Sequence, residues 1–225
     1  MLENYWMISY STLVCLALSA AIAILKYRRL DIAFKTFGLY IITNLVIENA
    51  ALFLARQGTN NYALVHLFTF LEFILLSFFY FEIIRKPAAF RKMMYFLAPV
   101  IALYIICNTL FIQGIDQINS YSETLENLII ISFSIFYFYR VLLEQEPQTV
   151  RGQALNLINS GIIIYLAGSL FIFMFSAYLL KSAPEAHIPF FIFNGILNLI
   201  SKILFLLAMI KIGFSKPKLP FVDAG

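Results

Sequence analysis

Long apolar stretches alternate with short polar connections along the whole chain. A bilayer core about 30 Å thick is spanned by roughly 20 consecutive apolar residues in an α-helix. Stretches of this kind occur seven times, at residues 5–26, 32–55, 62–84, 94–112, 124–143, 155–180 and 188–212. They are continuous and lack the residue-by-residue alternation of membrane β-strands. The pattern therefore predicts an all-α integral membrane protein, a bundle of seven transmembrane helices in one domain over residues 1–225.

The composition supports a membrane protein and argues against a soluble one. Hydrophobic residues make up 62% of the chain and charged residues 12%, with a mean hydropathy of +0.87. Soluble domains have about 45–50% apolar and about 25% charged residues. The net charge of +4 does not indicate nucleic-acid binding, because the cations are spread over short connections between apolar stretches. Membrane lipids are the expected partners, and nucleic acid is not.

The distribution of Lys and Arg predicts the orientation of the helices. One side of the predicted bundle, counting helix ends, connections and the C-terminal tail, holds thirteen of these residues, and the other side holds two. Cytoplasmic loops carry the excess of Lys and Arg, so the first side is expected to be cytoplasmic. The thirteen are Lys26, Arg28, Arg29, Lys35, Arg85, Lys86, Arg91, Lys92, Arg140, Arg151, Lys211, Lys216 and Lys218, and the two are Arg56 and Lys181. An odd number of helices then places the N-terminus outside and the C-terminus in the cytoplasm.

The first apolar stretch is expected to be a retained helix. Its start carries Glu3, and the basic residues Lys26, Arg28 and Arg29 follow the stretch. A signal peptide has the opposite order, with cations before the apolar segment.

Ionisable side chains within the predicted helices are the main candidates for function, because each is costly to place in a membrane. Counting a rise of about 1.5 Å per residue puts Glu72 and Lys202 within roughly 3 Å of the midplane. This depth predicts a buried ion pair between them. Glu48, Glu126 and His66 are expected roughly 7–10 Å further toward the outside.

Helical spacing groups further polar residues with these. Asn194, Asn198 and Lys202 recur every four residues in the seventh helix, and Asn44 and Glu48 have the same spacing in the second. Side chains four residues apart share one helix face. Together they predict a ligand pocket that opens outward between the second, third, fifth and seventh helices. Its candidate residues are Lys202, Glu72, Glu48, Glu126, His66, Asn194, Asn198 and Asn44.

Structural explanations exist for the same residues. A Lys–Glu pair with neighbouring Asn side chains can simply fix helix packing, and His66 and Glu126 can be solvated near the interface. The sequence contains no HExxH, GxSxG or Gly-rich phosphate loop. Its histidines are His66 and His187, and its cysteines, Cys15 and Cys107, lie in apolar stretches. Neither an enzyme nor a metal site is expected.

Two resemblances bear on identity. The stretches at residues 66–73, 122–127 and 194–203 resemble a family of small, uncharacterised seven-helix membrane proteins of Bacteroidetes-type bacteria. That resemblance implies a bacterial inner membrane and supplies no function. A lysine in the seventh helix of a chain with an outside N-terminus is also similar to the microbial rhodopsins. It would make Lys202 the attachment site for retinal and Glu72 the counter-ion. Asn198 stands where those proteins usually have aspartate, and the sixth helix lacks their Trp and Pro.

We therefore expect a sensor or receptor-like module that binds a small ligand from outside and signals through a separate cytoplasmic partner. The alternatives are a proton-coupled transporter of small solutes, a rhodopsin-like retinal-binding protein and a structural membrane protein without a ligand. Except for retinal in the rhodopsin-like alternative, no cofactor is expected.

Overall fold

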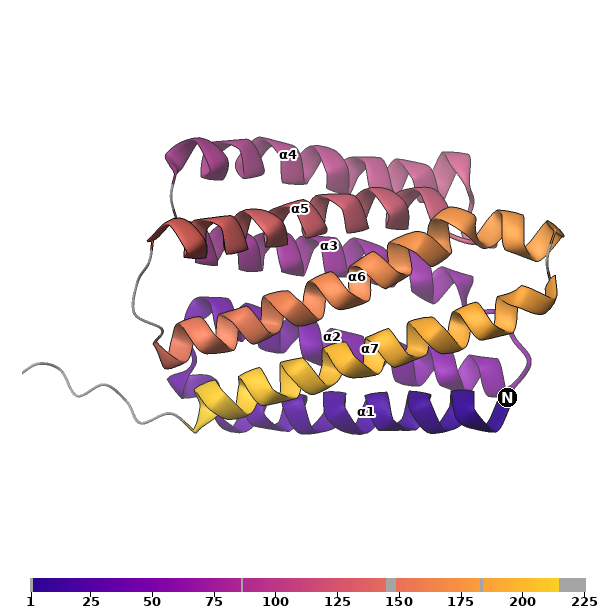
Figure 1. Cartoon of the computed structure of the whole chain (residues 1–225). Coiled ribbons are helices and arrows are strands. Elements are labelled where there is room, and N and C mark those ends of the chain that lie inside the picture. The colour runs from indigo at the N-terminus through magenta and orange to yellow at the C-terminus, as the bar shows by residue number, and fades with distance from the viewer. Residues whose placement is uncertain (1, 86, 145–148, 183, 215–225) are drawn as a thin grey trace, which may run out of the picture.

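The computed structural model describes residues 2–85, 87–144, 149–182 and 184–214, without the side chains of residues 2–5, 144, 173–182, 184–188 and 191. Within these residues the fold is all-α, and seven helices are long and apolar enough to cross a membrane (Figure 1). They are α1 (Leu2–Leu25), α2 (Ile32–Arg56), α3 (Tyr62–Ile83), α4 (Ala88–Cys107), α5 (Ser120–Glu144), α6 (Val150–Ser182) and α7 (Pro184–Gly213). A short 3-10 helix, η1 (Tyr27–Arg29), follows α1, and a π-helical turn, η2 (Asn108–Ile112), continues α4. The chain is therefore a multi-pass membrane protein.

The helices begin and end where local chemistry allows. Asp31 caps α2, because its side chain accepts a hydrogen bond from the Phe34 backbone N–H at 3.1 Å. Gly58 follows α2 with a φ of 70°, a left-handed conformation that glycine adopts without strain. Pro87 stands at the N-cap of α4, and α4 begins six residues before the predicted stretch starts at residue 94. Arg91 therefore lies within a helix and not in a connection as predicted.

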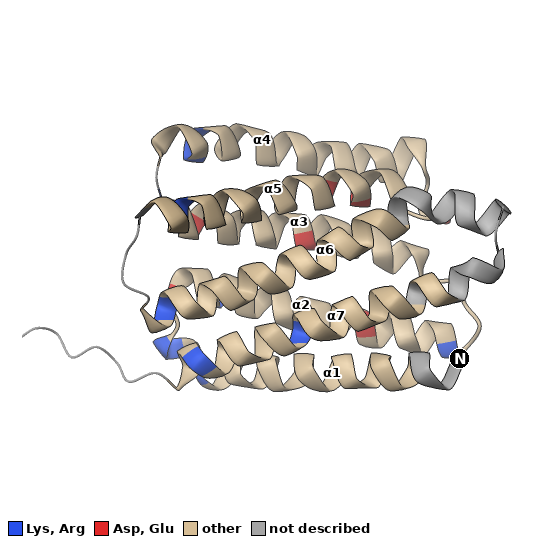
Figure 2. Cartoon of the chain, viewed as in Figure 1, with Lys and Arg blue, Asp and Glu red and all other residues tan. Residues whose placement is uncertain are grey.

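Successive helices run in opposite directions, so the bundle has two distinct ends (Figure 1). We name the end where α1 starts the N-terminal end, and the end where α7 finishes the cationic end. Most described Lys and Arg residues gather at the cationic end (Figure 2). Arg56 ends α2 and so lies at the N-terminal end, whereas Lys202 lies well inside α7. The predicted cations Lys86, Lys216 and Lys218 lie outside the described residues, and the side chain of Lys181 is not described.

The helices are packed to different extents. Helix α7 lies against α6 and α1, α2 packs against α1 and α3, and α5 packs against α6. Helix α4 packs mainly against α3 and forms an edge of the bundle (Figure 1). Gly161 lets α6 approach α7 closely, because a Cβ atom at this position would meet the Phe205 ring at 2.6 Å and the Ser201 carbonyl oxygen at 3.1 Å.

Aromatic residues fill the core toward the cationic end. The Phe37 ring meets Phe205 edge-on at 4.9 Å between centroids and lies 5.4 Å from Phe79. Next to them, the Tyr80 hydroxyl donates to Asn159 Oδ1 at 2.9 Å, and the Ser134 hydroxyl donates to the same oxygen at 2.9 Å. This half of the bundle is therefore tightly packed around one small polar cluster.

Candidate functional site

Lys202 lies on α7 in the middle of the bundle and is 0% exposed. Its Nζ atom stands over three aromatic rings, with centroids at 4.7 Å (Tyr165), 5.3 Å (Phe205) and 5.9 Å (Tyr40). Cation–π attraction of this kind is strongest where the cation has lost its water. These rings therefore help to compensate an ammonium group that no solvent reaches.

Asn44 connects Lys202 to a carboxylate. With its amide oxygen turned toward the ammonium group, Asn44 accepts a hydrogen bond from Lys202 Nζ at 3.0 Å and donates one to Glu48 Oε1 at 3.0 Å. Asn198 Nδ2 donates to the same Glu48 oxygen at 3.1 Å. Asn44 and Glu48, four residues apart on α2, thus meet Asn198 and Lys202, four residues apart on α7. We call Asn44, Glu48, Asn198 and Lys202 the lysine cluster.

Glu72 lies on α3 beside this cluster without touching its ammonium group. Its Oε1 atom accepts a hydrogen bond of 2.8 Å from the Tyr40 hydroxyl. Among the described residues, Lys202 forms no ion pair within 4.0 Å with either Glu72 or Glu48. The predicted direct Glu72–Lys202 ion pair is therefore wrong. Tyr40, one turn before Asn44 on α2, takes the place next to the carboxylate and leaves Glu72 interacting with Lys202 only at longer range.

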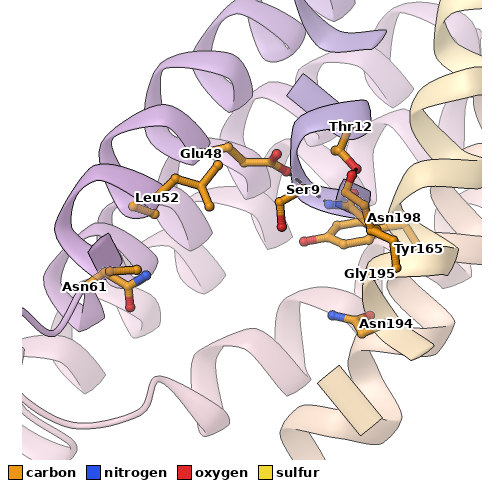
Figure 3. Close-up of a pocket in the computed structure, with 12 residues that line it drawn as sticks. Ser9, Thr12, Glu48, Leu52, Asn61, Tyr165, Asn194, Gly195 and Asn198 are labelled. Atoms are coloured by element: carbon orange, nitrogen blue, oxygen red, sulfur yellow. Dashed lines mark hydrogen bonds between the residues drawn. The ribbon is translucent and has the colours of Figure 1, made fainter. Parts of the chain in front are cut away.

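A polar pocket opens from the N-terminal end toward the lysine cluster (Figure 3). It has a volume of about 210 Å³ and lies between α1, α2, α6 and α7. Glu48 points into it, toward Asn198, as Figure 3 shows. The lining residues are Ile8, Ser9, Thr12, Glu48, Ala51, Leu52, Ala55, Asn61, Tyr165, Asn194, Gly195 and Asn198.

The pocket does not lie between the helices that the sequence predicts. Of the candidate residues, Glu48, Asn194 and Asn198 line it, and Asn44 and Lys202 lie behind Glu48. Helices α1 and α6 form its walls, where the prediction has α3 and α5. The sequence analysis missed these two helices because Ser9, Thr12 and Tyr165 are common in packed membrane helices. Only the structure shows that the three side chains line one pocket.

His66 belongs to a second polar cluster, between α3 and the connection that follows α4. Its ring is buried, with Nδ1 2.9 Å from Thr109 Oγ1 and Nε2 3.2 Å from the Gln117 carbonyl oxygen. Nε2 donates, because it faces a carbonyl oxygen. The one hydroxyl proton of Thr109 lies between two acceptors, His66 Nδ1 and the Ile105 carbonyl oxygen at 3.0 Å. Both ring nitrogens are therefore engaged in holding this connection.

Asn108 is the centre of that second cluster, which the sequence analysis missed. Its Nδ2 atom lies 2.8 Å from Ser122 Oγ and 3.0 Å from Gln113 Oε1. Asn119 in turn donates to Thr69 Oγ1 on α3 at 2.9 Å. The sequence places residues 113–119 in the connection between the fourth and fifth predicted stretches. In the structure, Gln113 and Asn119 at its two ends are buried and residues 115–117 between them are exposed, so this connection covers the N-terminal end of α3, α4 and α5.

Glu126 lies on α5, below this seal and away from the pocket. It is 1% exposed, and neither carboxyl oxygen has a hydrogen-bond partner among the described residues. Glu123 Oε2 and Asn127 Nδ2, both nearby in sequence, are also buried without partners there. Glu72 interacts electrostatically with both glutamates and with Lys202. It therefore connects the lysine cluster to a group of buried carboxyls that we call the acidic cluster (Glu72, Glu123 and Glu126).

Metal binding has no geometric support in the described part of the chain, where no group of three or more His, Cys, Asp or Glu residues could hold an ion. Retinal attachment would need the Lys202 amine to face a ligand-sized space. Instead, its Nζ atom donates to Asn44 and does not line the pocket. The retinal alternative stays a prediction, which visible absorption after adding retinal to the purified protein would test.

Comparisons with protein-family models, with curated proteins and with solved structures gave no match. The two resemblances therefore stay hypotheses that rest on their own sequence stretches, and the fold and the site carry the functional argument.

Proposed function

We propose that this chain is a receptor-like membrane module whose pocket binds a small ligand with an amine or another hydrogen-bond donor. One observation carries the proposal. The pocket ends at Glu48, whose carboxylate is held by Asn198 and through Asn44 by the buried Lys202. A ligand that engages Glu48 would change the charge balance around a lysine in the middle of the bundle.

The pocket walls favour a donor on the ligand. Only Oε1 of Glu48 receives hydrogen bonds within the described residues, which leaves Oε2 as an acceptor. Asn198 Oδ1 is buried without a donor there as well. Two acceptors at the end of one pocket suit an ammonium group or an amide. The volume of about 210 Å³ is below the about 300–1,000 Å³ of sites for drug-sized molecules, so the ligand would be small.

The proposal also includes the orientation of the bundle in the membrane and the route by which ligand binding is signalled. The excess of cations at one end supports a cytoplasmic cationic end, so that the pocket would open to the outside of a bacterial inner membrane. Packed aromatic rings close the other half of the bundle, which favours sensing over passage. A separate cytoplasmic partner would receive the signal at the cationic end.

Thermal unfolding of the detergent-solubilised protein tests the proposal. A panel of small amines is compared with neutral isosteres and carboxylic acids. An amine at 100 times its Kd stabilises the folded state by about 2.7 kcal/mol. Glu48→Gln is expected to abolish this gain. Glu82→Gln changes a glutamate in the last turn of α3, at the cationic end and away from the pocket, and serves as the matched control. If no amine stabilises the protein, or if Glu48→Gln responds like wild type, the proposal is wrong.

Proton-coupled transport is the second candidate, and the acidic cluster supports it. Glu72, Glu123 and Glu126 are buried, whereas the ammonium group of Lys202 interacts with Glu72 and the half-buried Glu48 only, and uncompensated buried charges are expensive. Carboxyls that take up and release protons would resolve this imbalance. In proteoliposomes with an internal pH dye, solute-driven proton flux that Glu126→Gln abolishes would favour transport over sensing. Amine binding without any flux would favour the receptor.

A further inference from the structure

A large apolar groove lies between α3 and α4, two helices that do not line the ligand pocket. Its volume is about 800 Å³. Its walls are almost entirely apolar: Phe73, Ile74, Ser77, Phe78, Phe81, Met94, Tyr95, Phe96, Ala98, Pro99, Val100 and Ala102. Tyr95, Phe96 and Val100 are 70%, 61% and 62% exposed, so that this surface would face lipid. A groove of this kind within the bilayer will be filled by hydrocarbon.

Two polar atoms at the groove lack a hydrogen-bond partner among the residues that the structure describes. The Arg91 guanidinium lies 4.2 Å from the centroid of Phe81, a residue of the groove wall, and its Nε atom is buried without a hydrogen-bond partner among the described residues. Ser77 lines the groove, and its hydroxyl is likewise buried without a partner. Both atoms are donors in an apolar setting, where an unsatisfied donor is costly.

Their levels match the polar part of a phospholipid. Ser77 lies four residues from Phe81 on α3, which is about 6 Å deeper in the membrane at 1.5 Å per residue. The headgroup region of one leaflet is roughly 5–7 Å thick, from the difference between the full bilayer and its hydrocarbon core. A phosphate at Arg91 would therefore place the start of the acyl chains near Ser77.

We propose that the groove between α3 and α4 binds one anionic phospholipid, with its phosphate on Arg91 and an acyl chain along Phe78 and Ala98. The charge at this end selects that occupant. Lys92 follows Arg91 on α4, and further cations gather at the same end of the bundle (Figure 2); such cations attract anionic headgroups. A second copy inserted in the same orientation would bring its own excess of cations to the same level, and the two cationic ends would repel each other.

Native mass spectrometry of the protein in mild detergent tests the headgroup contact. Added phosphatidylglycerol is compared with phosphatidylcholine of the same chain length. Wild type is expected to retain one phosphatidylglycerol in preference to phosphatidylcholine. Arg91→Gln should weaken phosphatidylglycerol binding about fivefold, since one cation near an anionic membrane contributes on that order. Lys92→Gln removes a neighbouring exposed cation and should leave binding unchanged. Equal losses in both variants, or equal binding of the two lipids to wild type, would overturn the proposal.

A second pair of variants tests the groove itself. Ala98→Trp fills the groove and should remove the bound lipid, whereas Leu103→Trp, on an exposed residue outside the groove lining, should not. Unchanged binding in Ala98→Trp would contradict the proposal, as would a lipid-free dimer in wild type. Melting temperatures close to that of wild type show that all variants are folded.

Discussion

The burial of Lys202 is expected to dominate the stability of single-residue variants. Lys202→Met leaves Glu48 and Asn44 without the charge that they surround, and breaking a buried ionic group by removing one member costs about 3–5 kcal/mol. Unfolding by denaturant in detergent measures this loss. Lys211→Met changes an exposed lysine in the last turn of the same helix and should cost less than about 0.5 kcal/mol. A small effect at Lys202 would show that its charge is not compensated by these contacts.

The connection through Asn44 predicts coupling between Glu48 and Lys202. In a double-mutant cycle of Glu48→Gln and Lys202→Met, the double variant should be more stable than the sum of the single losses implies, by about 0.5–3 kcal/mol. The physical reason is that the second substitution removes a charge that the first has left unpaired. Additive losses would contradict the lysine cluster as one electrostatic unit.

The polar cluster near the cationic end predicts a second coupled pair. Asn159→Leu leaves the Tyr80 hydroxyl buried without its acceptor, and leaves the Ser134 hydroxyl only the Asn159 carbonyl oxygen at 3.4 Å, at about 1–3 kcal/mol for an unsatisfied group. Adding Tyr80→Phe should restore part of the loss in thermal stability, because it removes the hydroxyl that has no acceptor. No recovery in the double variant would mean that Tyr80 does not depend on Asn159.

At this scale the sequence predicts contacts within a helix better than contacts between helices. The spacings of Asn44 with Glu48 and of Asn198 with Lys202 were correct, because they follow from helical geometry alone. The predicted partner of Glu72 was wrong, because the depth of two residues in the bilayer does not show whether another side chain lies between them. Tyr40 reads as one more aromatic core residue, and only the packing of α2 against α3 shows that its hydroxyl reaches the carboxylate.

Among the elements, the seven membrane helices were predictable because length and hydropathy are properties of contiguous sequence. The start of α4 was not, since Arg91 and Lys92 were assigned to the connection before the fourth apolar stretch. The structure shows how Arg91 can lie within the helix: its guanidinium covers the ring of Phe81 on α3. The connection from 113 to 119 shows another limit, because polar composition does not reveal that Gln113 and Asn119 at its ends are buried.

The close approach of α6 and α7 gives a prediction for Gly161. Gly161→Ala places a methyl group against the Phe205 ring and a backbone carbonyl of α7. Overpacking of this kind costs about 1–3 kcal/mol. Gly152→Ala on the same helix meets only Thr149 Oγ1, at 3.5 Å, and should be neutral or stabilising, because alanine favours helix over glycine. Equal melting temperatures for the two variants would show that the two helices can separate without cost.

The molecule as a whole is asymmetric along its axis. The ligand pocket, the acidic cluster and the sealed connection all lie toward the N-terminal end or the middle, whereas aromatic packing occupies the cationic half. A ligand that enters from the N-terminal end therefore meets Glu48 and then a closed core. Which compartment that ligand comes from depends entirely on the orientation of the bundle, which no internal contact determines.

Cysteine accessibility decides this orientation. In a variant whose native Cys15 and Cys107 are replaced by alanine, Asp116→Cys places an exposed thiol at the N-terminal end and Ala88→Cys places one at the cationic end. Because cytoplasmic loops hold the excess of Lys and Arg, a membrane-impermeant maleimide added to intact cells should label Asp116→Cys and leave Ala88→Cys unlabelled. Permeabilised cells should label both, which shows that each thiol is reactive. The reverse pattern in intact cells would turn the pocket toward the cytoplasm, and the receptor proposal would then require a cytoplasmic ligand.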